Sequence, residues 1–313
     1  MKKLIIFLIF LLLVGCSQIE KSDETPLLDK GFRHYELSEY ELAIDCFING
    51  LLDGEENPLA YQKLGIMYKN GYGTEVNLDK AIEYYELAIM GNDAGSMNNL
   101  GVMYLNGEGV ILDYDKAREL FEKGSALGYD MCYYNLGMMY ENGLGVSIDY
   151  NKAISYYEQC DNVLAYEALG RIYNYNLANG EKAVEYYLKV IDESSNAAYE
   201  LGKLYDEGKL VQEDVTKAYD YYLLAADNGN GDAYDNLGYL YEIGRFVIQD
   251  KNMAKDYYQK AAELNCAYGF FDLGRCYEYG IGIDIDLDKA MSYYEIAYTL
   301  GVNQAKEKME ELD

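Results

Sequence analysis

The chain has 313 residues, of which 50% are hydrophobic and 14% aromatic, and its 54 acidic and 26 basic residues give a formal net charge of −28. This acidity argues against nucleic acid and anionic lipid as binding partners, because both need clustered lysine and arginine. The acidic residues are spread along the whole chain, which is typical of a self-repelling, soluble surface. Attraction of a basic partner or of cations is the alternative interpretation.

The chain begins with a pattern that predicts export. Two lysines precede an apolar run of 11 residues, 4–14, which is shorter than the roughly 20 residues of a spanning helix and typical of a secretory signal. The run ends in Leu13-Val14-Gly15-Cys16, which resembles a bacterial lipobox. That resemblance implies that residues 1–15 are a signal peptide and that Cys16 carries the lipid. An ordinary signal peptide with a chance cysteine is the alternative. Residues 16–26 are polar and predict a flexible tether.

Residues 27–57 predict a first helical hairpin, because Gly31 and Gly65 are 34 residues apart, the period of tetratricopeptide-type units. Seven longer units follow over residues 58–301, and their Leu-Gly pairs are separated by 36, 36, 33, 32, 36 and 36 residues. The pairs are Leu64-Gly65, Leu100-Gly101, Leu136-Gly137, Leu169-Gly170, Leu201-Gly202, Leu237-Gly238 and Leu273-Gly274. A fixed period in this range indicates a stacked repeat array.

Each unit predicts two helices joined by a glycine turn. A tyrosine follows each Leu by four residues and shares its helix face, and the glycine within this helix predicts close approach of a second helix. The second helix starts after an Asn or Asp, as at Asp113, which predicts an N-cap. The first helix ends at a glycine such as Gly107, a position that favours left-handed backbone. In the fourth unit Asn176 stands there, and we expect it to adopt the same conformation.

These columns carry a family resemblance. The pattern L-G-x-x-Y-x-x-G-x-G-V, followed by D-x-x-K-A and Y-Y-E-x-A, resembles the Sel-one-like repeat, a branch of the tetratricopeptide superfamily. Residues 101–117 and 137–153 are close matches. The resemblance implies an all-α fold, a right-handed α-solenoid of about eight antiparallel helix hairpins. Residues 302–313 are charged and predict a C-terminal capping helix.

The sequence offers little support for catalysis. The single histidine, His34, excludes His-His metal motifs and makes a catalytic dyad improbable. No Ser-x-x-Lys nucleophile motif and no phosphate-binding loop occurs. We therefore expect no catalytic residue, no metal site, no cofactor and no enzymatic activity.

Cys132 opens the first helix of its unit and Cys160 closes the second helix of the same unit. The ends of an antiparallel hairpin are neighbours, so a disulfide between these two residues is one expectation. Small buried thiols at packing positions are the alternative.

In tetratricopeptide-type arrays the first helix of each hairpin lines a concave groove. By that resemblance, the columns three residues before and one residue after each glycine face the groove, and their residues vary between units. The residues expected to bind a protein or peptide there are Asn98, Tyr134, Tyr199, Asp235, Tyr239 and Phe271. Tyrosine suits recognition surfaces because it gives contact area with little entropy loss.

The resemblance implies a non-enzymatic scaffold or adaptor, bound to the bacterial cell envelope through its N-terminal lipid, at the outer membrane and periplasm or at the cell surface. Its partner would be a protein or peptide rather than nucleic acid. The alternative is an accessory protein that binds or hydrolyses cell-wall glycan, with peptidoglycan or β-lactam as related ligands. Aromatic rows can stack on sugars, and a glycosidase would need two carboxylates about 5–10 Å apart across one cleft.

Overall fold

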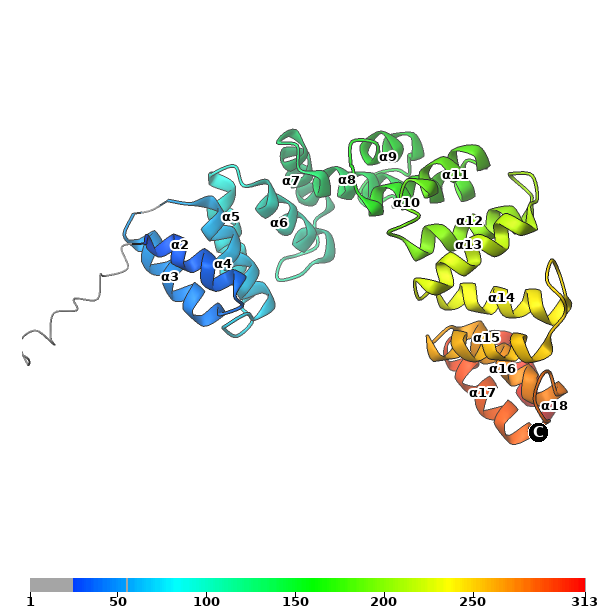
Figure 1. Ribbon diagram of the computed structural model, residues 1–313. Coiled ribbons are helices and arrows are strands. Elements are labelled where there is room, and N and C mark those ends of the chain that lie inside the picture. The colour runs from blue at the N-terminus through cyan, green and yellow to red at the C-terminus, as the bar shows by residue number, and fades with distance from the viewer. Residues whose placement is uncertain (1–24, 55, 313) are drawn as a thin grey trace, which may run out of the picture. The chain divides into compact units, whose positions relative to one another are not determined.

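The computed structural model describes residues 25–54 and 56–312, which form helices and no strand (Figure 1). The helices are α2 (Leu27–Glu36), α3 (Tyr40–Leu52), α4 (Pro58–Asn70), α5 (Leu78–Met90), α6 (Ala94–Asn106), α7 (Tyr114–Ala126), α8 (Asp130–Asn142), α9 (Tyr150–Tyr157), α10 (Val163–Arg171), the π-helix η1 (Ile172–Asn176), α11 (Gly180–Leu188), α12 (Ser195–Glu207), α13 (Val215–Asp227), α14 (Gly231–Ile243), α15 (Lys251–Glu263), α16 (Ala267–Tyr279), α17 (Leu287–Thr299) and α18 (Asn303–Leu312). The predicted all-α repeat fold is confirmed. Cys16 and the signal segment lie outside the described residues.

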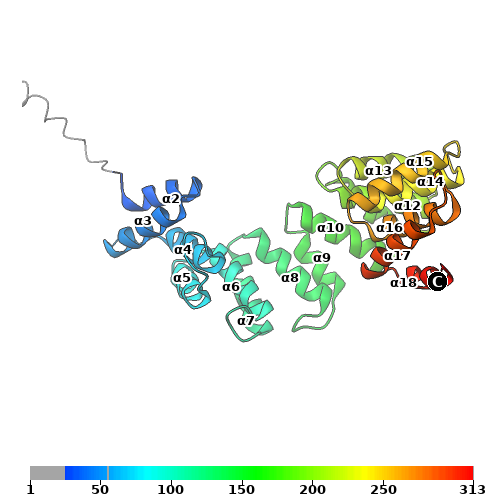
Figure 2. The same cartoon turned by 90° about the horizontal axis from the view of Figure 1, so that it is seen from below.

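The chain divides into two compact units, one up to Cys132 and one from Tyr133 onward. In the first unit α2 packs on α3, α4 on α5 and α6 on α7. In the second unit α10 packs on α11, α12 on α13, α14 on α15 and α16 on α17, and α18 covers α17. Figures 1 and 2 show these helices as successive pairs joined by short turns. Among the described residues, no helix has the length and apolar character needed to cross a membrane.

The predicted N-caps are present. The side chain of Asp113 accepts a hydrogen bond from the backbone N–H of Lys116 at 3.0 Å, and the corresponding Asn or Asp caps the second helix in the other six repeats. At the other end of the first helices, Gly107 adopts left-handed backbone with a φ of 68°. These caps satisfy backbone groups that a helix end leaves unpaired.

The fourth repeat departs from the prediction for Asn176. This residue ends the π-helix η1, and the left-handed residue of the turn is Ala178, with a φ of 51°. The turn between the two helices is shorter here than in the other repeats, and the wider π-helical turn changes the direction of the chain before Asn179 caps α11. The expectation of a left-handed Asn176 was wrong.

The glycine of each Leu-Gly pair lies against a flat aromatic ring of the second helix. An added Cβ at Gly170 would lie 2.4 Å from Cε1 of Tyr187, and at Gly202 it would lie 2.5 Å from Cδ1 of Tyr222. The same contact holds in the remaining repeats. Side-chain atoms at such distances clash, so only glycine admits the ring. The predicted close approach of the second helix is therefore confirmed, with an aromatic ring as the group that approaches.

A second ring contact occurs in six of the seven Leu-Gly hairpins. The tyrosine three residues after the glycine stacks on the first tyrosine of the aromatic pair in the second helix, as Tyr140 does on Tyr156 with ring centroids 5.7 Å apart. Five other hairpins contain this stack: Tyr68–Tyr84, Tyr173–Tyr186, Tyr205–Tyr221, Tyr241–Tyr257 and Tyr277–Tyr293. A lysine from the start of the second helix lies over the first ring, as Lys152 does over Tyr140. Stacking and cation–π contact both stabilise the hairpin.

Candidate functional site

The first helices of the second unit carry a series of charged side chains, which we call the first-helix ladder. It is defined by Glu141, Arg171, Glu200, Lys203, Asp206, Glu242, Arg275 and Glu278. These residues stand one or four positions after a Leu-Gly glycine, except Glu200, which stands two positions before one. Three of its members, Arg171, Lys203 and Arg275, lie in a column where the sequence predicts partner binding, one residue after the glycine.

The ladder begins at phenol groups in the core. The hydroxyl of Tyr157 donates to Glu141 Oε2 at 2.7 Å, and the hydroxyl of Tyr258 donates to Glu242 Oε2 at 2.7 Å. Burial raises the pKa of both tyrosines, and the hydrogen bond to the neighbouring carboxylate raises it further. The phenols therefore remain protonated and act as donors at every physiological pH. Tyr294 makes the same contact with Glu278.

Two of these carboxylates, Glu141 and Glu242, are then bound by an arginine from the next first helix. Arg171 on α10 holds Glu141 on α8 through Nη2, at 2.8 Å from Oε1 and 3.0 Å from Oε2. Arg275 on α16 holds Glu242 on α14 at 2.8 Å. The Glu141 side chain is only 9% exposed, whereas that of Arg171 is 50% exposed. A buried carboxylate is thus neutralised by a guanidinium that still reaches solvent.

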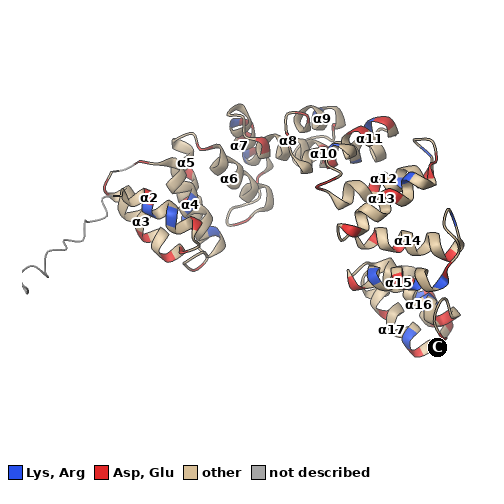
Figure 3. Ribbon diagram, viewed as in Figure 1, with Lys and Arg blue, Asp and Glu red and all other residues tan. Residues whose placement is uncertain are grey.

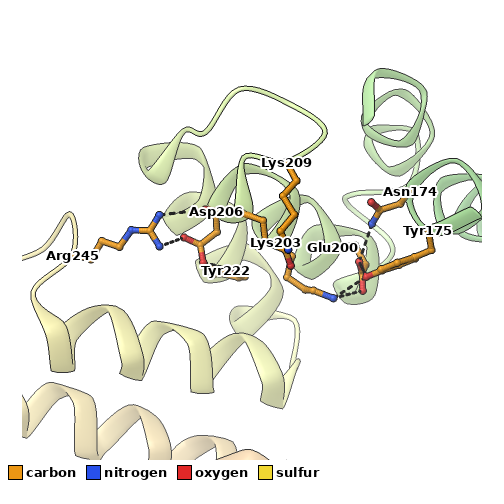
Figure 4. Close-up of polar contacts among 9 residues, drawn as sticks. Asn174, Tyr175, Glu200, Lys203, Asp206, Lys209, Tyr222 and Arg245 are labelled. Atoms are coloured by element: carbon orange, nitrogen blue, oxygen red, sulfur yellow. Dashed lines mark hydrogen bonds and ion pairs between the residues drawn. The ribbon is translucent and has the colours of Figure 1, made fainter. Parts of the chain in front are cut away.

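The middle of the ladder uses other residue types (Figure 4). Lys203 Nζ donates to the Tyr175 hydroxyl at 2.8 Å and lies 3.3 Å from Glu200 Oε1, and Tyr175 also contacts Glu200. Arg245, from the turn after α14, pairs with Asp206 on α12 at 2.7 Å. Neighbouring hairpins are thus joined by a lysine–phenol hydrogen bond at one position and by an arginine–aspartate ion pair at the next. Acidic and basic residues occur on helices throughout both units (Figure 3).

Two carboxyl groups meet near the end of the ladder. Burial raises the pKa of Asp235 well above its usual value, and the charges of Asp272 and Asp232 raise it further. Asp272 is bound by Arg275 and also hydrogen-bonds with Asp235. The proton of this pair therefore resides on Asp235, whose Oδ1 is buried and has no hydrogen-bond partner. The pair lies where α14 packs against α16.

The structure places the six predicted groove residues in different environments. Asn98 is buried on α6, at 9% exposure. The rings of Tyr134, Tyr199 and Phe271 are half-buried and contact the core tyrosine of their own hairpin, at centroid distances of 5.5, 6.0 and 5.5 Å. Asp235 belongs to the carboxyl pair. Tyr239 on α14 is the most exposed of the six, at 50%. Partner binding by these residues remains a prediction.

The expected disulfide between Cys132 and Cys160 is not formed in the structure, since Cys132 is a buried free thiol. Its sulfur packs over Gly124 of α7, in the preceding hairpin, where an added Cβ would lie 2.4 Å from Sγ. Cys160 is also buried, and its thiol donates to the backbone carbonyl of Tyr156. Among the described residues no cluster of His, Cys, Asp and Glu has the geometry of a metal site.

Sequence reasoning assigned Arg171, Lys203 and Arg275 to a variable column and missed their partners. A signal for these partners exists in the repeat register. Glu242 precedes Arg275 by 33 residues, and Glu141 precedes Arg171 by 30 in the shortened repeat. A carboxylate that precedes an arginine by the length of one repeat therefore indicates an ion pair between adjacent first helices.

The paired helices, the capped turns and the polar contacts between successive first helices define an α-helical repeat protein of the tetratricopeptide-like class. The Sel1 repeat model matches residues 58–93, 94–129, 130–159, 163–193, 195–230, 231–266 and 271–302. The chain belongs to the Sel1 repeat family, whose members generally act as scaffolds for protein–protein interactions.

Several solved structures have a similar fold. A protective antigen from uropathogenic Escherichia coli with an SLR fold has 26% identity and a TM-score of 0.74; the match covers 93% of this chain but only 66% of that protein. A Sel1 repeat protein from Oxalobacter formigenes has 23% identity and a TM-score of 0.75 over 95% of this chain and 89% of that one. Yeast Tom70 has 16% identity and a TM-score of 0.54 over 95% of this chain and 65% of its own.

Proposed function

We propose that this protein is a non-enzymatic scaffold, anchored by a lipid on Cys16 to the bacterial cell envelope, that holds a protein or peptide along the first-helix ladder. The observation that carries the proposal is the ladder itself. Its buried carboxylates are fixed by phenols and by partly exposed cations, so the surface is ordered before any partner arrives. Preorganised side chains lose little entropy on binding.

The variation along the ladder supports a specific partner. The residues that stabilise the fold are the same from one repeat to the next. The residue one position after the glycine differs, and it is Arg171, Lys203 and Tyr239 in three successive repeats. Tyr239 stands one residue after its glycine, as Arg171 and Lys203 do, and offers a half-exposed ring of the kind that is enriched in binding hot spots. A partner segment with an apolar side chain flanked by polar or basic groups fits this surface.

The carboxyl pair does not favour the glycan-hydrolysing alternative. The two carboxylates of a glycosidase stand on opposite sides of a sugar, about 5–10 Å apart. Asp235 and Asp272 instead share a hydrogen bond, and Arg275 binds Asp272. This arrangement leaves no room for a sugar between the carboxyls, so we assign the pair a role in packing.

The test compares two tyrosines of similar exposure. Tyr239 on α14 is 50% exposed and Tyr298 on α17 is 45% exposed. A protein starting after Cys16 is used to capture partners from detergent-solubilised envelopes, in parallel with the Tyr239→Ala and Tyr298→Ala variants. We expect one discrete protein that Tyr239→Ala loses and Tyr298→Ala retains. Equal capture by all three proteins, or recovery of cell-wall fragments alone, would refute binding along the ladder.

The anchor is tested separately. The full chain and its Cys16→Ser variant are expressed in a bacterium supplied with an alkyne-tagged fatty acid, and the membrane fraction is probed for label. We expect label and membrane association for the full chain and neither for the variant. Unlabelled protein released as a processed soluble form would show that an ordinary signal peptide is present.

A further inference from the structure

One hairpin lacks the outer ring stack that the other six Leu-Gly repeats share. In α6–α7 the position occupied elsewhere by the first tyrosine of the aromatic pair is Leu120. The ring on the first helix is retained as Tyr104, and Lys116 still lies over it, 4.9 Å from the ring centroid. Among the described residues no aromatic ring stacks on Tyr104, whereas Tyr68 in the preceding hairpin stacks on Tyr84 at 5.6 Å.

A pocket occupies the place of the missing ring. Its cavity volume is about 360 Å³, which is within the range of small-ligand pockets. It lies within the first compact unit and is bounded by α5, α6 and α7. The apolar lining consists of Ile89, Met90, Leu100, Tyr104 and Leu120. Leu120 does not extend far enough to fill the slot that a tyrosine fills in the neighbouring hairpins.

The lining suits an aromatic side chain. Tyr104 offers a ring on which another ring can stack, as its counterparts do in the same chain. Met90 is 79% exposed, and its flexible thioether can close over the edge of a ring. The other hairpins therefore show what this slot accommodates: the flat ring of a tyrosine.

The charges at the pocket favour a basic segment around that ring. Glu86 and Glu119 line the pocket and are exposed. Glu119 is paired with Lys123, whereas Glu86 forms no ion pair with any described residue. Lys116 is the only cation in the lining and already lies over Tyr104. A lysine or arginine next to the incoming ring would therefore meet an uncompensated carboxylate.

We propose that this pocket is a docking site for a tyrosine or phenylalanine side chain of a protein partner, carried between basic residues, which completes the ring stack on Tyr104. The site does not rest on the first-helix ladder, and the two can be tested independently. It gives the first compact unit a recognition point of its own.

The test uses three short peptides. Acetyl-Lys-Tyr-Lys-amide is the probe, acetyl-Lys-Leu-Lys-amide removes the ring, and acetyl-Glu-Tyr-Glu-amide reverses the charge. Binding is followed through the NMR signals of the methyl groups of Met90 and Leu120. We expect the tyrosine probe to shift these signals and the ring-free peptide to bind roughly two- to tenfold more weakly, the range that aromatic pairs contribute. The acidic peptide should also bind more weakly.

Two reciprocal variants make the assignment specific. Leu120→Tyr supplies the missing ring from the chain itself, so it should raise the melting temperature and abolish probe binding. Tyr84→Leu removes the ring from the preceding hairpin, so it should lower the melting temperature and create a second site for the probe.

The proposal is overturned if the ring-free peptide binds as tightly as the tyrosine probe. It is also overturned if Leu120→Tyr leaves binding unchanged, or if no methyl signal responds. Shifts that appear on raising the protein concentration without peptide would identify a second copy of the chain as the occupant, and would equally overturn a separate partner.

Discussion

Glu141 and Arg171 are 30 residues apart in the chain, yet the guanidinium of Arg171 holds the carboxylate of Glu141 at 2.8 Å. The two residues belong to first helices of consecutive hairpins, α8 and α10. Because the Tyr157 phenol reaches the same carboxylate, one buried charge connects the core of one hairpin to the surface of the next.

Arg171→Ala should lower the free energy of unfolding by about 1–2 kcal/mol, because it leaves the buried Glu141 carboxylate with the Tyr157 phenol as its remaining partner. The loss is small for a buried charge because the arginine is half exposed and water screens its interaction. Urea unfolding followed by circular dichroism measures the change. Lys209→Ala is the matched control: this lysine is 75% exposed and pairs with Glu207 on the surface, so its loss should cost less than about 0.5 kcal/mol. Equal effects would contradict a special role for the Glu141 pair.

Gly202→Ala should destabilise the protein although alanine favours helix. The added Cβ would lie 2.5 Å from the Tyr222 ring, and such overpacking costs about 1–3 kcal/mol, which outweighs the roughly 1 kcal/mol gained in helix propensity. In a Tyr222→Leu background the ring is absent, so the same substitution should become neutral or stabilising. A double-mutant cycle by thermal and urea unfolding tests this dependence. Additive effects would show that the ring is not the cause.

Asp235→Asn should make the protein more stable at pH 7 and flatten its dependence on pH. The pKa of Asp235 is raised in the folded state by burial and by Asp272, so the folded protein retains this proton where the unfolded chain, with a pKa of about 3.9, has lost it. Its stabilising effect is full below that value and is lost as pH rises through the folded pKa. An amide keeps the donor to Asp272 without titrating.

The measurement for Asp235 is the urea midpoint between pH 4 and pH 8. The wild-type midpoint should fall with rising pH relative to that of the variant. Asp272, Asp232, Cys266 and Arg275 also act on this carboxyl, so the control is Asp256→Asn, which changes an exposed acid. Parallel profiles for wild type and Asp235→Asn would refute the raised pKa.

The described cysteines should differ in reactivity. Burial raises the pKa of Cys132, Cys266 and Cys276 to about 12, and a thiol reacts as its thiolate. Cys46 is only half-buried. In a protein lacking Cys16, a disulfide reagent at pH 8 should therefore modify Cys46 first, and Cys132, Cys266 and Cys276 only on unfolding. Mass spectrometry of digested samples checks the order. Early labelling of Cys276 would show that α16 opens readily.

The hairpins could be predicted from sequence because their determinants are local. Asp113 caps a helix three residues away and Gly107 ends one through its own backbone, so a single repeat contains the whole signal. The glycine contacts were predicted for the same reason: a costly residue recurring at one position requires a close neighbour. Repetition turned weak local preferences into a strong fold prediction.

The ladder and the Asn176 turn were not predictable in the same way. Contacts such as that of Glu242 with Arg275 join residues from different repeats, and their geometry depends on how far one hairpin is displaced from the next. In the shortened fourth repeat a π-helical turn follows the first helix. No residue pattern in the sequence specifically predicts such a turn. The rings of Tyr134 and Tyr199 were assigned to the groove from their column, yet both also pack on their own hairpin core.

The last hairpin shows how such an array can be brought to an end. Glu278 occupies the position at which Glu141 and Glu242 receive an arginine from the following repeat, but here the cation is Lys308 of α18, 3.5 Å away. Lys308 thus stands in for the arginine that Glu141 and Glu242 receive from the following first helix. A chain that stopped at α17 would leave the Glu278 carboxylate, which is only 10% exposed, with the Tyr294 phenol as its remaining partner. A single lysine on α18 therefore neutralises a buried charge that the last hairpin cannot neutralise by itself.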